Sequence, residues 1–258
     1  MRVSECSFGA LFKTGSSVMA TNEQAHSVAS SFQTGRVIEV YVGAITAESK
    51  PYLLPQTLLE NASDYFTKAL RSGSFKEGKE GRLHFPDDDS SAWEVLLYWL
   101  VKRHLPSHAS DQLLMINCWA LGDKYGITRF QDETMVELII IYDDQSAKPD
   151  SIAKALEVSG PGSKMRKLIA EELTWVYENE NISREDLGAI IDGTGIIVEF
   201  LAANELFRED EEGFANIFWK SNAATAGMEA KDRQAHWRDY LVGEEPVRHR
   251  VYDLELDQ

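Results

Sequence analysis

The chain has 258 residues, of which 43% are hydrophobic and 26% are charged, the usual composition of a globular protein. Its formal net charge of −16 is uneven: residues 171–258 combine 8 Lys and Arg with 21 Asp and Glu, a net of −13. A surface of that sign repels phosphate polymers and anionic lipid, so nucleic acid and membrane surfaces are excluded as expected partners.

The first part of the chain predicts a tail followed by short strands and helices. Residues 1–35 are rich in Ser, Thr, Gly and Ala without periodicity, and we interpret them as a flexible tail. The run 37–42, dense in β-branched and aromatic residues and stopped by Gly43, predicts a strand. Two further short strands are expected over 51–54, with Pro55 at its end, and over 82–85. Short helices are expected over 56–59 and 62–70. Residues 72–81 contain three glycines and predict a flexible segment.

Three better-marked helices are expected next. Ser91–Glu94 has the pattern of a capping box and predicts a helix start. A second helix is predicted from Asp111, with Gly126 at its C-cap. Thr128–Gln131 is another capping-box pattern, which predicts a third helix running towards Ile141.

The rest of the chain predicts helices alone. Pro and Gly break the pattern at 148–150 and again at 159–163. Helical periodicity follows over 165–177, 184–191, 196–207 and, more weakly, 229–241. We therefore interpret residues 144–258 as an acidic all-helical region with loose final residues. Whether this region is an independent domain or packs on the first half stays open.

Residue types that catalyse reactions or bind metals occur without workable geometry. His104 and His108 are four residues apart, as metal ligands on a helix are, but Leu105-Pro106 between them should end a helix. Phosphate-binding loops follow a strand, but the glycine-rich stretches 159–163 and 192–195 do not. We therefore interpret both as turns.

Two further groups have a chemical and a structural interpretation. Asp87-Asp88-Asp89 could bind a cation, but a solvated turn that caps the following helix is favoured. Trp93, Trp99 and Trp119 could line a ligand pocket, but their helical spacing favours the core. We therefore expect no enzyme, no cofactor and no metal.

The cysteine content and the lack of apolar runs bear on the compartment. Cys6 and Cys118 lie far apart and form no CxxC pair, which suits a reducing environment. The sequence shows no signal-peptide pattern and no run near the ~20 apolar residues that span a bilayer. The expected location is intracellular, in cytoplasm or nucleus.

Several short motifs follow one another in an order known from one family. They are Val40-Tyr41-Val42-Gly43, Lys50-Pro51-Tyr52, Leu58-Leu59, Ser63-Asp64-Tyr65-Phe66, Gly73-Ser74-Phe75-Lys76-Glu77, Phe85-Pro86-Asp87-Asp88-Asp89 and Leu121-Gly122-Asp123-Lys124-Tyr125-Gly126-Ile127. Together they resemble a BTB/POZ domain of the type abundant in filamentous fungi. The chain departs from the family pattern at Val37 (often Asp), Pro55 (usually His), Asp64 (Pro) and Val101-Lys102-Arg103 (Y-T-G).

The resemblance implies an α+β fold, a helical cluster flanked by a short β-sheet, with the acidic helical region behind it. The implied organisation is a tail at 1–35, a BTB/POZ-like domain at 36–143 and the helical region at 144–258. It further implies homodimerisation and the docking of other proteins.

The resemblance also points to a docking motif. In relatives that serve ubiquitin ligases, a hydrophobic-x-Glu motif before the third strand contacts a cullin scaffold, and Phe75-Lys76-Glu77 matches it. The first hypothesis is a non-catalytic adaptor that links a cullin-type ubiquitin ligase to an unknown protein substrate. The alternative is an oligomerisation or assembly scaffold with no ligase link. For Phe75, a place sealing the loop onto the core is an equally weighted interpretation.

Overall fold

The structure is a computed structural model. It describes residues 30, 35–46, 49–71, 75–106, 111–179, 182–209, 237–244 and 247. Over these residues the chain is a mixed α+β protein, mostly helical, with one three-stranded sheet. The expected α+β class is therefore confirmed at this level. None of the helices in the described ranges is long and apolar enough to cross a membrane.

The sheet has the strand order β2-β1-β3, with β1 (Val37–Val42) in the centre. β2 (Tyr52–Pro55) runs antiparallel to β1, whereas β3 (Arg82–Phe85) runs parallel to it. Alternate residues of the strands are buried on one face, among them Ile38, Val40 and Leu83, which is the period-2 pattern of a half-buried sheet. The predicted strands are confirmed, the second with a shift of one residue.

Three short helices follow the hairpin: α2 (Gln56–Glu60), α3 (Asp64–Leu70) and α4 (Lys76–Glu80). The flexible segment predicted over 72–81 is wrong where α4 forms; residues 72–74 lie outside the described part of the chain. The reason is a contact distant in sequence. The Arg36 guanidinium donates hydrogen bonds to the carbonyls of Gly78 and Lys79, at 2.7 and 3.2 Å, and so satisfies the end of α4.

The three long helices expected next are α5 (Ser90–Lys102), α6 (Gln112–Tyr125) and α7 (Thr128–Asp144). The predicted helix start at Asp111 is confirmed, and its side chain caps α6 by accepting a hydrogen bond from the backbone N–H of Leu114. Gly126 is left-handed at φ +64°, and the N–H of Ile127 bonds to the carbonyl of Gly122 at 2.8 Å, which confirms the predicted C-cap.

Both predicted capping boxes are wrong. The N-cap of α5 is Asp89, whose carboxylate accepts a hydrogen bond from the backbone N–H of Ala92 at 2.8 Å, so Ser91 lies inside the helix. An Asp two residues upstream is an equally good cap and starts the helix earlier. Thr128 is likewise the first residue of α7. The turn that closes α6 leads directly into α7 and puts Ile127 at the N-cap. The hydrocarbon side chain of Ile127 cannot accept a capping hydrogen bond.

The remaining helices are α8 (Pro149–Val158), α9 (Lys164–Glu178), α10 (Arg184–Thr194), α11 (Ile197–Glu209) and the 3₁₀ turn η2 (Arg238–Tyr240). The predictions over 165–177, 184–191 and 196–207 are confirmed. A break does separate α7 from α8, over 145–148, and α8 begins inside the expected 148–150, with Pro149 in the first turn, where its missing N–H costs nothing. Most of the helix predicted over 229–241 lies outside the described residues.

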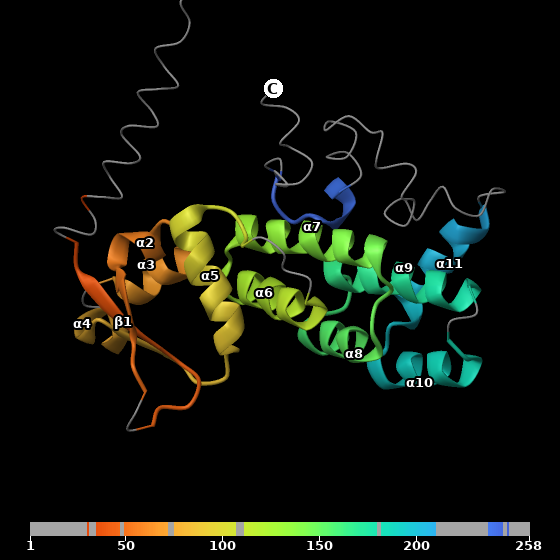
Figure 1. The fold of residues 1–258 in the computed structure, drawn as a ribbon, viewed down its shortest axis with the longest axis horizontal. Coiled ribbons are helices and arrows are strands. Elements are labelled where there is room, and N and C mark those ends of the chain that lie inside the picture. Colours follow the sequence, from red (N-terminus) through yellow and green to blue (C-terminus); the bar gives the residue numbers. More distant parts are fainter. Residues whose placement is uncertain are drawn as a thin grey trace, which may run out of the picture.

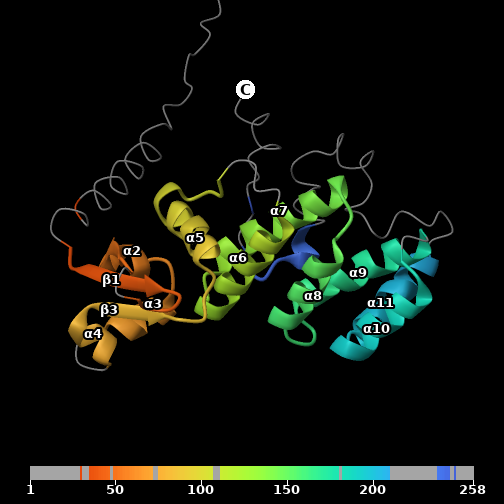
Figure 2. The same cartoon turned by 60° about the horizontal axis from the view of Figure 1, so that its bottom comes forward.

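The molecule is elongated, with the sheet and α4 at one end and α10 and α11 at the other (Figure 1). Helices α8 and α9 pack beside α6 and α7, and one continuous apolar core extends from Ile38 to Val247 (Figure 2). Trp93, Trp99 and Trp119 belong to it, at most 2% exposed, which confirms their predicted core position. The domain boundary at 143/144 stays a prediction.

Candidate protein-docking groove

Phe75–Glu77, the predicted docking residues, lie at the start of helix α4, with Phe75 as its N-cap. Gly78 is buried against the end of α3, and a Cβ at this position would lie 2.6 Å from the carbonyl oxygen of Arg71. Glycine is therefore required for this approach of the two helices. Together with the hydrogen bonds from Arg36, this packing presents Phe75 and Glu77 from an ordered turn.

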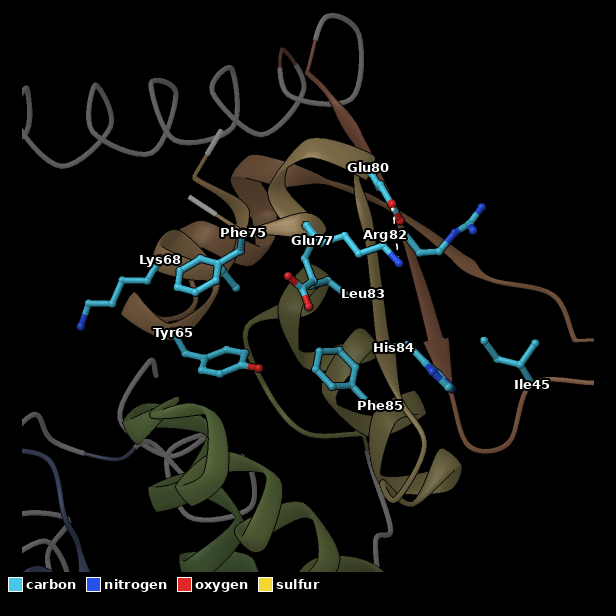
Figure 3. Close-up of a pocket in the computed structure, with 12 residues that line it drawn as sticks. Ile45, Tyr65, Lys68, Phe75, Glu77, Glu80, Arg82, Leu83, His84 and Phe85 are labelled. Atoms are coloured by element: carbon cyan, nitrogen blue, oxygen red, sulfur yellow. Dashed lines mark ion pairs between the residues drawn. The ribbon is translucent and has the colours of Figure 1, made fainter. Parts of the chain in front are cut away.

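A groove of about 520 Å³ runs between α3, α4 and β3 (Figure 3). It is lined by Ile45, Tyr65, Lys68, Ala69, Phe75, Lys76, Glu77, Glu80, Arg82, Leu83, His84 and Phe85. Three of its large side chains are exposed to solvent: Phe75 is 55% exposed, Ile45 52% and Tyr65 43%. The exposure of Phe75 disfavours the interpretation in which its ring seals a loop onto the core. All three predicted docking residues lie in the groove wall.

The charges around the groove are partly paired. Arg82 contacts the Glu39 carboxylate at 2.9 Å, and this hydrogen bond raises the pKa of Arg82. Lys76 and Glu80 form an exposed pair at 3.8 Å, of a kind that contributes little to stability. Within the described ranges, no ion pair joins Glu77. Its carboxylate is therefore available to a cationic or hydrogen-bonding partner.

An aromatic cluster makes the back of the groove rigid. The ring centroid of Tyr125 lies 5.0 Å from that of Tyr65 and 5.1 Å from that of Phe85, and Phe85 stacks on Trp93 at 5.0 Å. Edge-on and offset ring contacts of this kind add stability beyond the buried area. The wall of the groove therefore needs little ordering when a partner binds.

Asp88 holds this cluster together, which corrects the solvated turn predicted for Asp87-Asp88-Asp89. Its side chain is only 3% exposed and accepts hydrogen bonds from Trp93 Nε1 at 2.8 Å and Tyr125 Oη at 2.5 Å. Lys124 contacts its other oxygen at 2.7 Å. Burial, and then the bond to Asp88, raises the pKa of Tyr125, which keeps this hydroxyl a donor at neutral pH. Only Asp89 has the predicted capping role.

The histidine and cysteine positions show no reactive arrangement over the residues that the structure describes. His104 lies beyond the end of α5, with Nδ1 2.8 Å from the carbonyl oxygen of Leu105, and His108 is outside the described residues. Burial raises the pKa of the Cys118 thiol, so it stays protonated. No cluster of three potential metal ligands occurs among the described residues.

Sequence reasoning missed the opposite wall of the groove, formed by Tyr65 and Lys68 of α3. One signal was present. Adjacent helical residues point about 100° apart, so only one of the neighbouring aromatic residues Tyr65 and Phe66 can face the core. In the structure Phe66 is fully buried and Tyr65 faces the groove. No match to this chain comes from protein-family models or from curated proteins. Its function is therefore inferred from the groove and the residues on it.

Proposed function

We propose that this chain is a non-catalytic protein-interaction adaptor with a BTB/POZ-type domain at 36–143, which docks a cullin-type scaffold in the groove. The observation that carries the proposal is the ring of Phe75, 55% exposed in a groove that also presents the Glu77 carboxylate. The motif positions support it too: Phe85–Asp89 leads into α5, and Leu121–Ile127 ends α6, as the resemblance implies.

The division of roles follows from the chemistry of the two side chains. An exposed aromatic ring is a typical interface anchor, because it buries a large area with little loss of conformational entropy. The Glu77 carboxylate, two residues away, can accept hydrogen bonds from a partner and fix its orientation. The partner should accordingly present an apolar pocket beside a cation or N–H group. The adaptor's protein substrate would bind elsewhere on the chain.

The test measures affinity of the full chain for a purified cullin scaffold by calorimetry. Phe75→Ala should weaken binding about thirtyfold, the equivalent of about 2 kcal/mol, whereas Glu77→Gln should have a smaller effect if the charge lies at a wet rim. Tyr98→Ala is the matched control, because Tyr98 is also an exposed aromatic residue, 36% exposed, but does not line the groove. Equal binding by Phe75→Ala and wild type would contradict the proposal.

The alternative, an assembly scaffold without a ligase link, is favoured by a different surface. Val37 and Leu53 are 54% and 64% exposed, on the two strands of the hairpin. A second copy of the chain could cover them, provided that the interface reaches the usual total of about 1,600 Å². Light scattering should then show a dimer that Leu53→Lys converts to monomer. A dimer with no affinity for the cullin scaffold would favour this alternative.

A further inference from the structure

Helix α11 lies at the end of the molecule away from α4 (Figures 1 and 2). Its outer face exposes an apolar stripe. Val198 is 72% exposed, Leu201 54%, Leu206 45% and Ile197 42%. Residues three and four apart are neighbours on a helix, so Ile197 and Val198 both adjoin Leu201. Exposed Ala202 lies between Val198 and Leu206. Exposed apolar residues that lie singly need no explanation, but a continuous stripe marks a binding surface.

The orientation of this stripe is fixed by the other face of α11. Phe200 and Ala203 are buried in the core, and α11 packs along α9. The Glu199 carboxylate accepts hydrogen bonds from Arg166 Nε and from the backbone N–H of Gly162, both at 3.1 Å. With its inner face anchored in this way, α11 cannot rotate to bury the outer stripe. Over the described residues, the stripe therefore faces away from the core.

Carboxylates outnumber cations in the sequence around the stripe. Residues 178–209 contain eight Asp and Glu but only two Arg and no Lys. Exposed Glu205 lies one turn beyond Leu201 on α11. Exposed Glu178 accepts a hydrogen bond from Asn204 at 3.3 Å, which places a second carboxylate beside the same helix. An apolar helix face with carboxylates beside it is complementary to an apolar segment flanked by cations.

We propose that the outer face of α11 binds an amphipathic helix of a partner protein whose apolar stripe is flanked by Lys and Arg. The helical spacing of the exposed residues suits a partner that presents i, i+3 and i+4 side chains. A second copy of the chain is a poorer occupant, because the two acidic surfaces would repel each other and four side chains fall short of the about 800 Å² that each partner of a standard interface buries. The site is separate from the groove and goes beyond the function proposed for it.

The test uses the full chain and two designed helical peptides of about five turns. Both carry the same leucine stripe; one is flanked by Lys, and its matched control by Glu. Fluorescence anisotropy should show that the Lys peptide binds about tenfold more tightly than the Glu peptide, and less so at high salt, where exposed charges are screened. The double variant Val198→Glu/Leu201→Glu should lose at least about tenfold in affinity for the Lys peptide. Its thermal melt should be unchanged, since both side chains are exposed.

A charge swap separates this site from non-specific attraction. Glu178→Lys/Glu205→Lys should reverse the preference and favour the Glu peptide, whereas Phe75→Ala should leave peptide binding intact. Failure of the cullin experiment would thus not affect this result. The proposal is overturned if the Lys peptide does not bind, if Val198→Glu/Leu201→Glu binds it equally well, or if both peptides bind alike. It is also overturned if the stripe variant dissolves a dimer of the wild type, because the occupant is then a second copy.

Discussion

Gly122 of α6 lies so close to Gln131 of α7 that a Cβ at position 122 would be 2.7 Å from the Cβ of Gln131. Real side chains do not approach to this distance, so the absence of a side chain at 122 permits the contact between the two helices. α6 and α7 form the middle of the elongated molecule, between the sheet and the C-terminal helices (Figure 1). Their spacing therefore affects how both ends are held.

Gly122→Ala should lower the free energy of unfolding by about 1–3 kcal/mol, because the added methyl group overpacks the contact with Gln131. Gly188 of α10 is the matched control, since no atom lies within 4 Å of a Cβ built there. Gly188→Ala should raise the free energy of unfolding by up to about 1 kcal/mol, through helix propensity and a less disordered unfolded chain. Urea unfolding measures both. Shifts in the same direction would show that the close contact is not what distinguishes the two positions.

Local sequence signals predicted most of the elements, because their causes are local. The β-branched and aromatic run 37–42 located β1, and the glycine at position 126 marked the end of α6. Helix α4 escaped prediction because the hydrogen bonds that complete it come from Arg36, about forty residues away in the chain. The N-terminus of α5 was misplaced because Asp89 and Ser91 are both good caps, and the spacing alone does not choose between them.

The candidate groove was predictable only in part. A short motif identified Phe75 and Glu77, but their facing wall comes from α3, and only the tertiary structure brings α3 and β3 together. Asp88 shows the same limit. Three consecutive Asp residues favour a solvated turn. The middle one, Asp88, is nevertheless buried, because it accepts hydrogen bonds from Trp93 and Tyr125. The apolar stripe of α11 was likewise hidden, because apolar residues in a helical pattern are expected in the core.

Glu133 of α7 should make stability depend on pH. Its carboxylate is buried and accepts hydrogen bonds from Trp99 Nε1 at 2.8 Å and Arg129 Nε at 3.1 Å; burial is the largest effect and raises its pKa above the ordinary 4.5. The folded protein thus holds this proton more tightly than the unfolded chain does. The stability contributed by Glu133 is full below the unfolded pKa and is lost as pH rises through the raised folded value.

Glu133→Gln, which keeps an acceptor for Trp99, should remove this dependence. The free energy of unfolding of the wild type, relative to that of Glu133→Gln, should fall as the pH is raised from the ordinary carboxyl value towards neutrality. Burial also raises the pKa of Asp132. Because Asp132 is present in both proteins, its effect cancels from the comparison. Urea unfolding at a series of pH values measures the difference. If the difference in free energy of unfolding between the two proteins is constant, or grows with pH, the pKa of Glu133 is not raised in the folded protein.

Gln112 should couple the two halves of the chain. This residue is 2% exposed at the start of α6, and its carboxamide bonds to the carbonyl of Ser146, the N–H of Lys148 and the hydroxyl of Ser151. Gln112→Ala leaves buried groups without these partners and should cost about 3 kcal/mol, whereas Ser151→Ala removes one side-chain hydroxyl and should cost about 1 kcal/mol.

The same unfolding curves examine the boundary predicted at 143/144. Because the apolar core and the Gln112 contacts cross it, tryptophan fluorescence and far-UV circular dichroism of the full chain should report one coincident transition. Gln112→Ala should shift both signals together. Two separate transitions in the wild type, or a fragment 36–143 as stable as the whole chain, would support an independent first domain instead.

Phe75→Ala should leave the free energy of unfolding within about 0.5 kcal/mol of the wild type, because a ring that is 55% exposed leaves no cavity when it is removed. Phe66→Ala is the matched core variant. Phe66 is fully buried in α3, stacked on Tyr125 at 5.5 Å and edge-on to Trp93 at 6.4 Å, and its loss should cost about 3–5 kcal/mol. Thermal melts of both variants, run with the scaffold-binding assay, separate docking from packing. A large fall in melting temperature for Phe75→Ala would mean that the ring supports the core, and the groove would then lose its proposed anchor.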